Sequence, residues 1–231
     1  MPTEKLTTMS DAIKQIADGS SVALGGSARR RHPMAAVREI ARQKKRDLIL
    51  YGWNNSVDYD VLIGAGCVRE AQTSYIDTDS EPFAQNLRRG MDAEKVRYVG
   101  HPTTTAIERF EAGAAGLTFT PSKVPLHTAL ESGQEYHAEI RCPFTGKSYA
   151  ATKAFAPDVG IIHAHRADKY GNIQLDRRRT TENDVDVVIA KSAKFLIVTV
   201  EHLVSEEAIA EEPALTLLPA LSVDLVVEAP Y

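Results

Sequence analysis

The amino-acid sequence predicts an α/β fold, an open and mostly parallel sheet with helices on both faces. Short apolar runs without polar alternation, at residues 22–24, 159–163 and 195–200, are typical of strands that are buried on both faces. Segments with helical spacing of apolar residues follow most such runs, an order that is typical of strand–helix–strand units. No internal repeat or low-complexity linker divides the chain, so we predict a single domain over residues 1–231.

The composition argues against several classes of protein. The 231 residues are 43% hydrophobic and 25% charged, which is ordinary for a globular chain. A net charge of -4 gives no general attraction to nucleic acid or to an anionic membrane. The two cysteines, Cys67 and Cys142, make no disulfide framework. The polar N-terminus and the lack of a long apolar run argue against a signal peptide and a membrane span. We therefore expect a cytoplasmic protein that binds neither nucleic acid nor membrane.

In the N-terminal half, predicted strands and helices alternate. Ser10 can cap a helix over residues 10–17, and Pro33 suits the first position of another helix. The apolar runs predict strands at 22–24, 47–51, 68–76 and 95–99. The 3.6-residue spacing predicts further helices at 57–65, 82–89 and 103–117.

The C-terminal half is less regular. Proline, glycine and serine punctuate residues 122–146, so we expect a long excursion or small antiparallel hairpins there. Further strands are predicted at 149–155, 159–163, 173–175, 195–200 and 223–228, and helices near 185–193 and at 204–210. Asp168, Gly171 and Asn172 are typical of a turn. The sequence ends at Tyr231, directly after a predicted strand, and this ending is compatible with a truncated C-terminus.

One stretch, residues 21–43, gives the strongest indication of a site. Gly25 and Gly26 end the first buried strand, where the lack of a Cβ allows a tight turn or the close approach of a ligand. A basic loop with three consecutive arginines follows, at the sheet edge where α/β folds bind ligands. Taken alone, the pattern favours a plain strand–helix turn, and it is neither a GxGxxG nor a P-loop sequence.

Six separated stretches resemble one family in their order and spacing. They are GGSARRRHPMAAVREIARQ, VDYDVLIGAG, LTFTP, DVGIIHAHRADKYGNIQL, KFLIVTVEHLVSEEAI and SVDLVVEAPY. Together they look like the α subunit of the family I CoA-transferases, of which glutaconate CoA-transferase is the closest well-known type. A steroid-degrading CoA-ester hydrolase shares the same pattern. The resemblance covers nearly the whole chain.

The resemblance implies a fold, a partner and a chemistry. The fold is an open sheet on a scaffold similar to sugar-phosphate isomerases, and the active site lies between this chain and a homologous β subunit. The substrates are an acyl-CoA and a carboxylic acid; coenzyme A enters as a thioester, and no cofactor is bound permanently. In such enzymes a glutamate attacks the acyl-CoA and then carries the CoA as a thioester. That glutamate belongs to the β subunit, so we expect no catalytic nucleophile in this chain.

The loop residues are the substrate-binding candidates by this resemblance. The N–H groups of Gly25 and Gly26, with Ser27 beside them, are expected to donate to an oxyanion or to a substrate carboxylate. Arg30 and Arg31 match the basic positions of the family's loop, and an arginine can bind a free carboxylate through two hydrogen bonds. The alternatives are a turn without a ligand and a salt bridge to the partner subunit.

Trp53, Asn54 and Asn55 depart from the family's pattern. In glutaconate CoA-transferase a small loop rich in glycine and alanine stands in their place. Larger polar and aromatic side chains would reshape an acyl pocket, which makes glutaconate itself a doubtful substrate. We predict that these three residues contact the substrate.

The glutamates of this chain are weak candidates for the nucleophile. The hydrolase branch carries its glutamate near the position of Thr103, where this chain has only threonines, so that role does not carry over. Glu108 and Glu111 are expected to face solvent from the predicted helix. Glu201 follows a buried strand at a carboxyl edge and is the better internal candidate, although a loop or subunit contact explains it equally well.

Two histidines raise the question of a metal. His163 and His165 alternate on one predicted strand and therefore point to the same face. Such a pair can bind zinc, but no third ligand follows at a recognisable spacing. We favour a structural role and predict no metal site.

Two other functions stay open beside the transferase. One is a CoA-ester hydrolase subunit, in which water replaces the acceptor acid. The other is a non-catalytic ligand-binding protein on the same scaffold, because a fold alone does not give a function. No helix-turn-helix pattern of a regulator is found. We favour the α subunit of a CoA-transferase, active only with its β-type partner.

Overall fold

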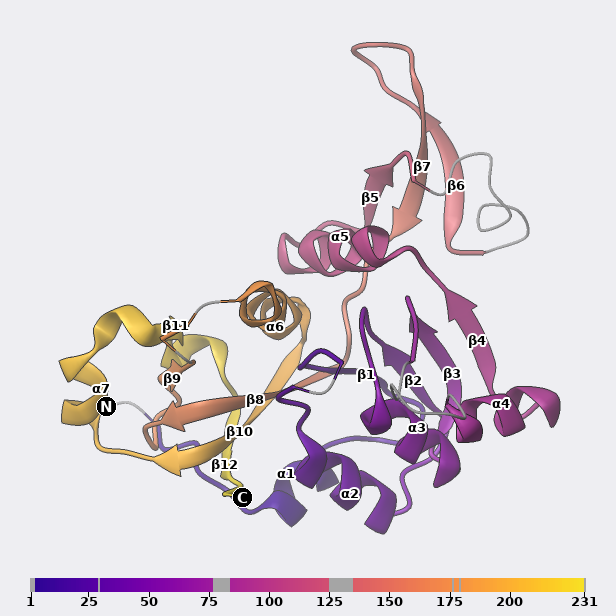
Figure 1. Cartoon of the computed structure of the whole chain (residues 1–231). Helices are drawn as coiled ribbons and strands as arrows, with labels where there is room; N and C mark the ends of the chain where they lie inside the picture. The colour runs from indigo at the N-terminus through magenta and orange to yellow at the C-terminus, as the bar shows by residue number, and fades with distance from the viewer. Residues whose placement is uncertain are drawn as a thin grey trace.

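A mostly parallel sheet forms the centre of the protein. The computed structural model describes residues 3–28, 30–76, 84–124, 135–175, 177–178 and 180–230. The strands of the main sheet are β1 Ser21–Leu24, β2 Leu48–Tyr51, β3 Val68–Thr73, β4 Arg97–Gly100, β8 Val159–Ala167, β9 Ile173–Gln174, β10 Phe195–Leu203, β11 Thr216–Leu218 and β12 Leu225–Glu228. The order β12–β10–β8–β1–β2–β3–β4 is parallel throughout, and β9 and β11 extend it antiparallel beyond the end of β8 (Figure 1). This arrangement confirms the predicted open sheet.

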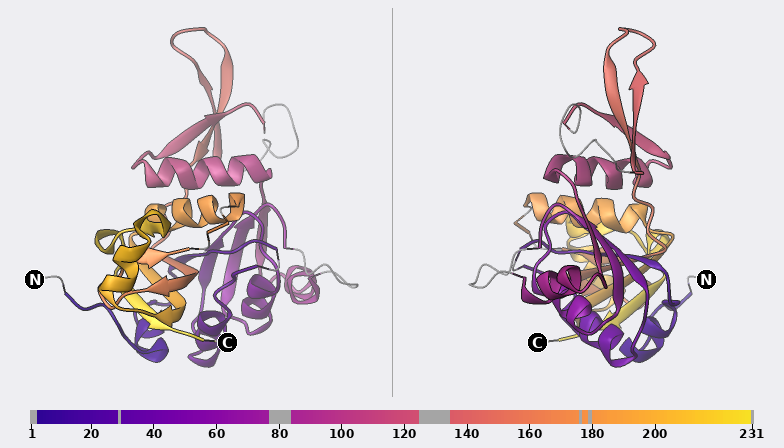
Figure 2. Two further views of the ribbon diagram at one scale, coloured as in Figure 1. Left: turned by 60° about the vertical axis from the view of Figure 1, so that its left-hand side comes forward. Right: turned by 90° about the vertical axis from the view of Figure 1, so that its right-hand side faces the viewer.

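Helices cover both faces of this sheet (Figures 1 and 2). Their bounds are α1 Met9–Lys14, α2 Met34–Arg42, α3 Val57–Gly64, α4 Gln85–Asp92, α5 Thr103–Ala114, α6 Thr181–Ser192 and α7 Glu206–Glu211. Helices α1 to α4 contribute to one hydrophobic core, and α5 and α6 to the other. Val22 and Leu24 of β1 enter the first core and Ala23 enters the second, because successive side chains of a strand point to opposite faces. A strand buried on both faces therefore has no solvent-facing position, as its apolar residues 22–24 indicate.

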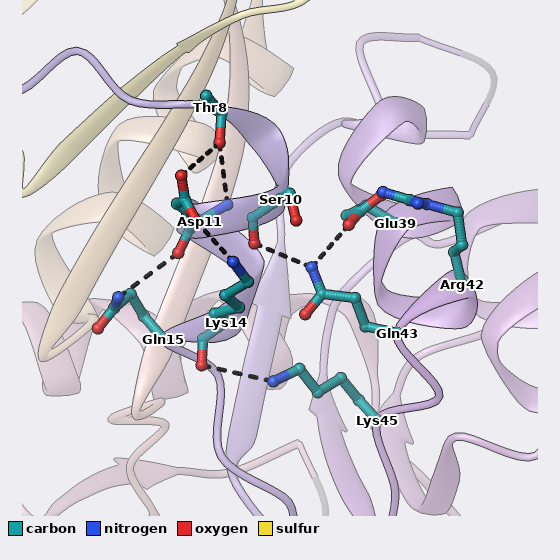
Figure 3. Close-up of polar contacts among 9 residues, drawn as sticks. All are labelled: Thr8, Ser10, Asp11, Lys14, Gln15, Glu39, Arg42, Gln43 and Lys45. Atoms are coloured by element: carbon teal, nitrogen blue, oxygen red, sulfur yellow. Dashed lines mark hydrogen bonds and ion pairs between the residues drawn. The ribbon is translucent and has the colours of Figure 1, made fainter.

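Polar contacts join α1 to α2 at the edge of the first core (Figure 3). The Gln43 side chain donates from Nε2 to the Glu39 carboxylate at 2.6 Å and to the Ser10 carbonyl oxygen at 2.9 Å. The cap of α1 differs from the expectation. Thr8 accepts from the Asp11 N–H at 3.1 Å and begins the helix, whereas Ser10 already lies inside it.

A second, smaller sheet projects from the main body beside α5 (Figure 1). It consists of β5 Phe119–Ser122, β6 His137–Arg141 and β7 Ser148–Lys153, antiparallel in the order β5–β7–β6. The β6–β7 hairpin confirms the expectation of hairpins within residues 122–146, of which 125–134 lie outside the described residues. The predicted strand at 149–155 is β7, but it belongs to this second sheet and ends before Phe155.

Other elements depart from the predictions in detail. In the described residues between α5 and α6 strands follow one another without a helix, so strands and helices do not alternate throughout. The strand predicted at 68–76 ends at Thr73, and Ile76 pairs only in an isolated bridge with Asn55. Strand β11 was not predicted at all. The helix predicted at 82–89 begins at Gln85 in the described residues. No helix in the described part of the chain has both the length and the apolar character that a membrane crossing requires.

Candidate active site

Two loops meet at the carboxyl edge of the sheet. Strand β1 ends at Leu24, opposite Ile161 of β8, while β8 and β10 continue beyond it. Residues 25–33 connect β1 to α2, and residues 52–56 connect β2 to α3. Ligands of open α/β sheets bind in the crevice at the carboxyl ends of the strands, so these loops occupy the position of a site.

The first loop depends on its glycines. A Cβ on Gly25 would lie 2.8 Å from Cγ2 of Ile162. Gly26 has a φ of +92°, and a Cβ there would lie 2.6 Å from the Arg30 carbonyl oxygen. Arg31 also has a positive φ, of 54°. Left-handed backbone is costly for residues with a side chain, and it concentrates at functional sites.

The two loops are hydrogen-bonded to each other. The Ala28 N–H donates to the Asn54 carbonyl oxygen at 3.1 Å. The Asn54 side chain donates from Nδ2 to the Ser27 hydroxyl at 2.9 Å. Ser27 and Arg30 also exchange backbone hydrogen bonds, of 3.0 and 2.8 Å, which closes the first loop into a tight turn. The positions of Ser27 and Asn54 are therefore coupled by these hydrogen bonds.

A buried ion pair reinforces this connection. Nδ1 of His32 lies 3.0 Å from Oδ2 of Asp58, and Nε2 lies 2.8 Å from the Ala28 carbonyl oxygen. Two acceptors around one imidazole favour its doubly protonated form. Burial works to lower the pKa of His32, but Asp58 and the Ala28 carbonyl oxygen outweigh it and raise the pKa above its ordinary value. Asp58 also accepts from the Ser56 N–H at 2.7 Å, so it joins the start of α3 to the first loop.

Asp186 on α6 holds the first loop from the other face of the sheet. It is fully buried; Oδ1 accepts from the Gly26 N–H at 2.7 Å, and Oδ2 lies 2.9 Å from Nη2 of Arg31. Burial raises the pKa of Asp186 to about 6, although Arg31 and the Gly26 N–H lower it. The sequence does not single out Asp186. The available signal was a charged residue three positions before the apolar Ile189, on the face of the helix that is expected to be buried.

The contacts of the loop separate the two arginines. Arg31 is mostly buried, with 16% of its side chain exposed, and its charge is balanced by Asp186. Arg30 is exposed, and its guanidinium forms no ion pair with a residue in the described ranges. Arg31 thus forms a salt bridge within the chain itself, which differs from the expected alternative of a salt bridge to the partner subunit. Arg30 is the cation that a ligand can reach without breaking a pair between described residues.

The glycine N–H groups are not free donors in this structure. Gly25 donates to the Ile161 carbonyl oxygen at 2.8 Å, as a continuation of the sheet. Gly26 donates to Asp186. Their expected donation to an oxyanion or carboxylate would require the exchange of these bonds. The geometry therefore favours a role in shaping the turn for both glycines.

The residues of the second loop take different positions. Trp53 packs in the second core and is 6% exposed. Asn55 is fully buried, where it accepts from the Thr73 hydroxyl at 2.9 Å and donates to Asp58 at 3.2 Å. In this structure Asn55 supports the loop from behind. Asn54 is the partly exposed member of the three, so direct contact of all three with a substrate stays a prediction.

The candidate glutamates lie in different environments. Glu201 is inside β10, near its carboxyl end, and does not follow the strand as expected. Its side chain is 30% exposed, and Oε1 lies 3.9 Å from Nε2 of His163. Glu111 faces solvent as expected, but Glu108 is half-buried with Oε2 inaccessible. Glu201 is thus the glutamate that lies among other polar groups at the sheet edge.

His163 and His165 both lie on β8, which places them on one face as expected. The described residues contain no group of three or more histidine, cysteine, aspartate or glutamate side chains suited to a metal. The side chains that converge at this edge are instead a cation, carboxylates and imidazoles. Such a set can bind an anionic acyl group and move a proton.

Comparison with known proteins agrees with this architecture. The family model described as coenzyme A transferase matches residues 6–229. A protein of Archaeoglobus fulgidus is 36% identical over 99% of this chain. The A subunit of 3-oxoadipate CoA-transferase from Pseudomonas knackmussii is 34% identical over 87% of it, and the A subunit of glutaconate CoA-transferase from Acidaminococcus fermentans is 31% identical over 98%.

The lengths and the solved structures complete this comparison. The chain spans 51% of the Archaeoglobus protein, 71% of the 3-oxoadipate subunit and 75% of the glutaconate subunit. The crystal structure of glutaconate coenzyme A-transferase from Acidaminococcus fermentans superposes with a TM-score of 0.89, over 98% of this chain and 76% of that one. The decarboxylase AibA/AibB C56S variant is 30% identical and superposes with a TM-score of 0.87, over 100% of this chain and 84% of that one. This chain belongs to the coenzyme A transferase family.

Proposed function

We propose that this chain is the α-type subunit of a heteromeric CoA-transferase, which moves CoA between an acyl-CoA and a carboxylic acid. The observation that carries the proposal is the pair of interlocked loops at the carboxyl edge, with the exposed Arg30 beside them, in a chain of this family. Two relatives that are at least 31% identical are named as A subunits of CoA-transferases. The loop pair supplies a rigid wall for an acyl group and a cation for its charge.

The partner in this proposal is a homologous β-type chain. The Archaeoglobus protein is about twice as long as this chain, so a second half accompanies the matching region there. The other two relatives are named as one lettered subunit of their enzymes, which also points to a further subunit. We place the nucleophilic glutamate on that partner, since Glu111 of this chain faces solvent on α5, Glu108 is half-buried on the same helix and Glu201 lies inside β10.

The reaction then needs no proton from this chain. The partner's carboxylate attacks the thioester carbonyl and the C–S bond breaks. CoA leaves as a thiolate, and the acyl group and the glutamate form a mixed anhydride. The thiolate attacks the glutamyl carbonyl of the anhydride, which releases the first acid and leaves CoA on the enzyme. The acceptor acid repeats these two steps in reverse. The chain described here binds the acyl group and orients it.

The substrate class follows from the two arginines. A free carboxylate on the acyl chain finds Arg30 unpaired among the described residues, whereas Arg31 would have to share its charge with Asp186. Ser27, Asn54 and the glycine turn form the wall beside this cation. We expect Arg30→Ala to raise the KM for succinyl-CoA about 10- to 150-fold, since charge-assisted contacts contribute roughly 1.5 to 3 kcal/mol, and to leave the KM for acetyl-CoA unchanged. An equal change for both would contradict the assignment.

Covalent trapping tests the central proposal. The chain is co-expressed with its β-type partner and incubated with an acyl-CoA but no acceptor, and hydroxylamine or borohydride then marks the thioester. We expect one modified glutamate, on the partner, and a new acyl-CoA once an acid is added. A label on Glu108, Glu111 or Glu201 would overturn the placement of the nucleophile. A monomer with full turnover would overturn the need for a partner.

A CoA-ester hydrolase subunit is the second candidate. The observation that favours it is the partly exposed carboxylate of Glu201 at the same sheet edge, because hydrolysis needs a base for water. The two candidates differ in how CoA release depends on an acceptor. Fast release that ignores added carboxylic acids supports the hydrolase, and little free CoA without an acceptor supports the transferase.

A further inference from the structure

Strand β6 lies at an open edge of the small sheet. Among the described residues it pairs with β7 alone. The Cys142 N–H donates to the Lys147 carbonyl oxygen at 2.9 Å, so Cys142 faces β7. Backbone groups alternate between the two sides of an antiparallel strand, and the N–H and C=O groups of Glu139 and Arg141 therefore point away from β7. Such an edge can accept a further strand.

The opposite edge of the same sheet is closed to pairing. The Ala154 N–H donates to the Thr118 carbonyl oxygen at 2.9 Å, which fixes the positions that face β7 along the β5 segment. By the same alternation Pro121 of β5 faces outward, and it has no N–H to donate. A proline on an edge strand is a common protection against edge-to-edge association. Strand β6 has no proline.

The charges of β6 are complementary to those of a second β6. Glu139 and Arg141 are exposed, point to the same face, and form no ion pair within the described ranges. When two copies pair antiparallel about a two-fold axis through Ile140, Glu139 of each copy lies opposite Arg141 of the other. An axis through Glu139 would also match the backbone groups, but it places two glutamates opposite each other, which is unfavourable. Charge therefore selects the axis through Ile140.

The apolar face of the small sheet continues across the same axis. Ile140 lies opposite Tyr149 of β7 and lines an apolar groove of about 490 Å³ together with Leu117, Phe119 and Phe144. Phe119 is 44% exposed and Phe144 is 93% exposed. Contiguous exposed apolar surface of this kind marks protein–protein contacts. The two Ile140 side chains would meet at the axis and join the two grooves.

The direction of β6 leaves room for a second copy. Tyr136, just before β6, donates from its hydroxyl to Glu70 of β3 at 2.8 Å, so the strand starts at the main body. From there the β6–β7 hairpin projects away from the rest of the molecule (Figure 1). Antiparallel pairing puts the tip of each hairpin beside the start of the other β6. The two main bodies then lie at opposite ends of the joined sheet.

We propose that β6 joins this chain to a second copy of itself. The two three-stranded sheets become one continuous antiparallel sheet, and the contact is isologous, with the same surface used on both copies. The inference goes beyond the proposed function, because it uses none of the loop residues at the carboxyl edge. It holds for a transferase and for a hydrolase alike.

Charge reversal tests this pairing in the full chain, alone and co-expressed with its β-type partner. Sedimentation velocity over a dilution series counts the copies of this chain in the assembly, and we expect two. Glu139→Arg or Arg141→Glu should weaken the association about 10-fold or more, because each places like charges opposite one another at two positions. The double variant, and an equal mixture of the two single variants, should restore it. Glu111→Arg, at an exposed position on α5, is the matched control and should change nothing.

A cross-link locates the two-fold axis. In a Cys142→Ser background, Ile140→Cys should form a disulfide between two copies, because directly opposite residues of this kind have Cα atoms about 4.5 Å apart. Ala138→Cys should not, since its two copies would lie about 14 Å apart. Circular dichroism checks that each variant folds. An assembly with a single copy of the wild-type chain, single variants that associate normally, or a double variant that stays dissociated would each overturn the inference.

Discussion

The loop of residues 25–33 and the contact between α5 and the small sheet each bury an arginine. The partners of these two guanidinium groups differ. Arg31 lies against the Asp186 carboxylate at 2.9 Å. Arg109 on α5 is 1% exposed and donates to neutral acceptors, the Gln72 side-chain oxygen at 3.1 Å and the Lys153 carbonyl oxygen at 2.6 Å. One cation is balanced by a charge, and the other is held by dipoles.

Burying the Arg109 cation among neutral partners disfavours its charged form. Burial lowers the pKa of Arg109 to about 9, so the group is still a cation at neutral pH. Burial also lowers the pKa of His101 to about 3, and the neutral ring accepts from Arg109 at 2.5 Å. Through Lys153 this arginine ties α5 to β7 of the small sheet, and its guanidinium carbon lies 3.6 Å from the centre of the Phe155 ring. Arg109 thus serves the joint between the two sheets, whereas Arg31 is held at the edge where ligands bind.

The largest expected effect is on the free energy of unfolding and tests the structural role of Arg109. Arg109→Met leaves several buried acceptors without a donor, and we expect it to lower the free energy of unfolding by about 3 to 5 kcal/mol. The control is Lys14→Met, whose side chain is 62% exposed and pairs with Asp11, which is 54% exposed. An exposed pair contributes less than about 1 kcal/mol. Urea unfolding followed by circular dichroism measures both, and equal losses would remove the distinction.

An intermediate effect concerns the charge of Asp186. Its pKa is about 6 in the folded protein and about 3.9 in an unfolded chain. Between these values the folded state holds a proton that the unfolded state has released, so this contribution to stability is greatest at low pH and falls as pH rises to about 6. We expect wild-type stability relative to Asp186→Asn to fall by about 1 to 3 kcal/mol across that window.

Asp158 provides a control of opposite sign, whose contribution to stability changes below this window. Burial works to raise its pKa, but Lys194 and Ser21 outweigh it and lower the pKa. Stability relative to Asp158→Asn should therefore rise with pH up to about 3.9, the pKa of an unfolded aspartate, and stay nearly flat across the window in which that relative to Asp186→Asn falls. Urea unfolding at several pH values gives both curves. A flat or rising curve for Asp186 would mean that Arg31 keeps it ionised throughout.

The sequence predicts the strands of the main sheet except β11, and it predicts the two loops, because these depend on local patterns. Buried strands such as β8 have apolar runs, and Gly25 and Gly26 mark the turn at the end of β1. Asp186 could not be predicted as part of the site, since its role depends on a helix that packs across the sheet from a loop 160 residues earlier. The assignment of β7 to a second sheet likewise depends on distant contacts, such as that of Arg109 with Lys153.

The smallest expected effect tests the other anchor of the loop, His32. Asp58 and the Ala28 carbonyl oxygen raise its pKa in spite of burial. A base whose pKa is raised by folding stabilises the protein fully below its unfolded value, about 6.5, and this contribution is lost as pH rises through the folded value. We expect His32→Gln to cost about 1 kcal/mol near pH 6 and less near pH 8.5. His202→Gln, at an exposed position, should show no such trend in the same urea titrations. If the cost of His32→Gln instead grew with pH, the neutral imidazole would be the form that joins the two loops. In that case Arg31, and not His32, would be the buried cation of the first loop whose charge a carboxylate balances.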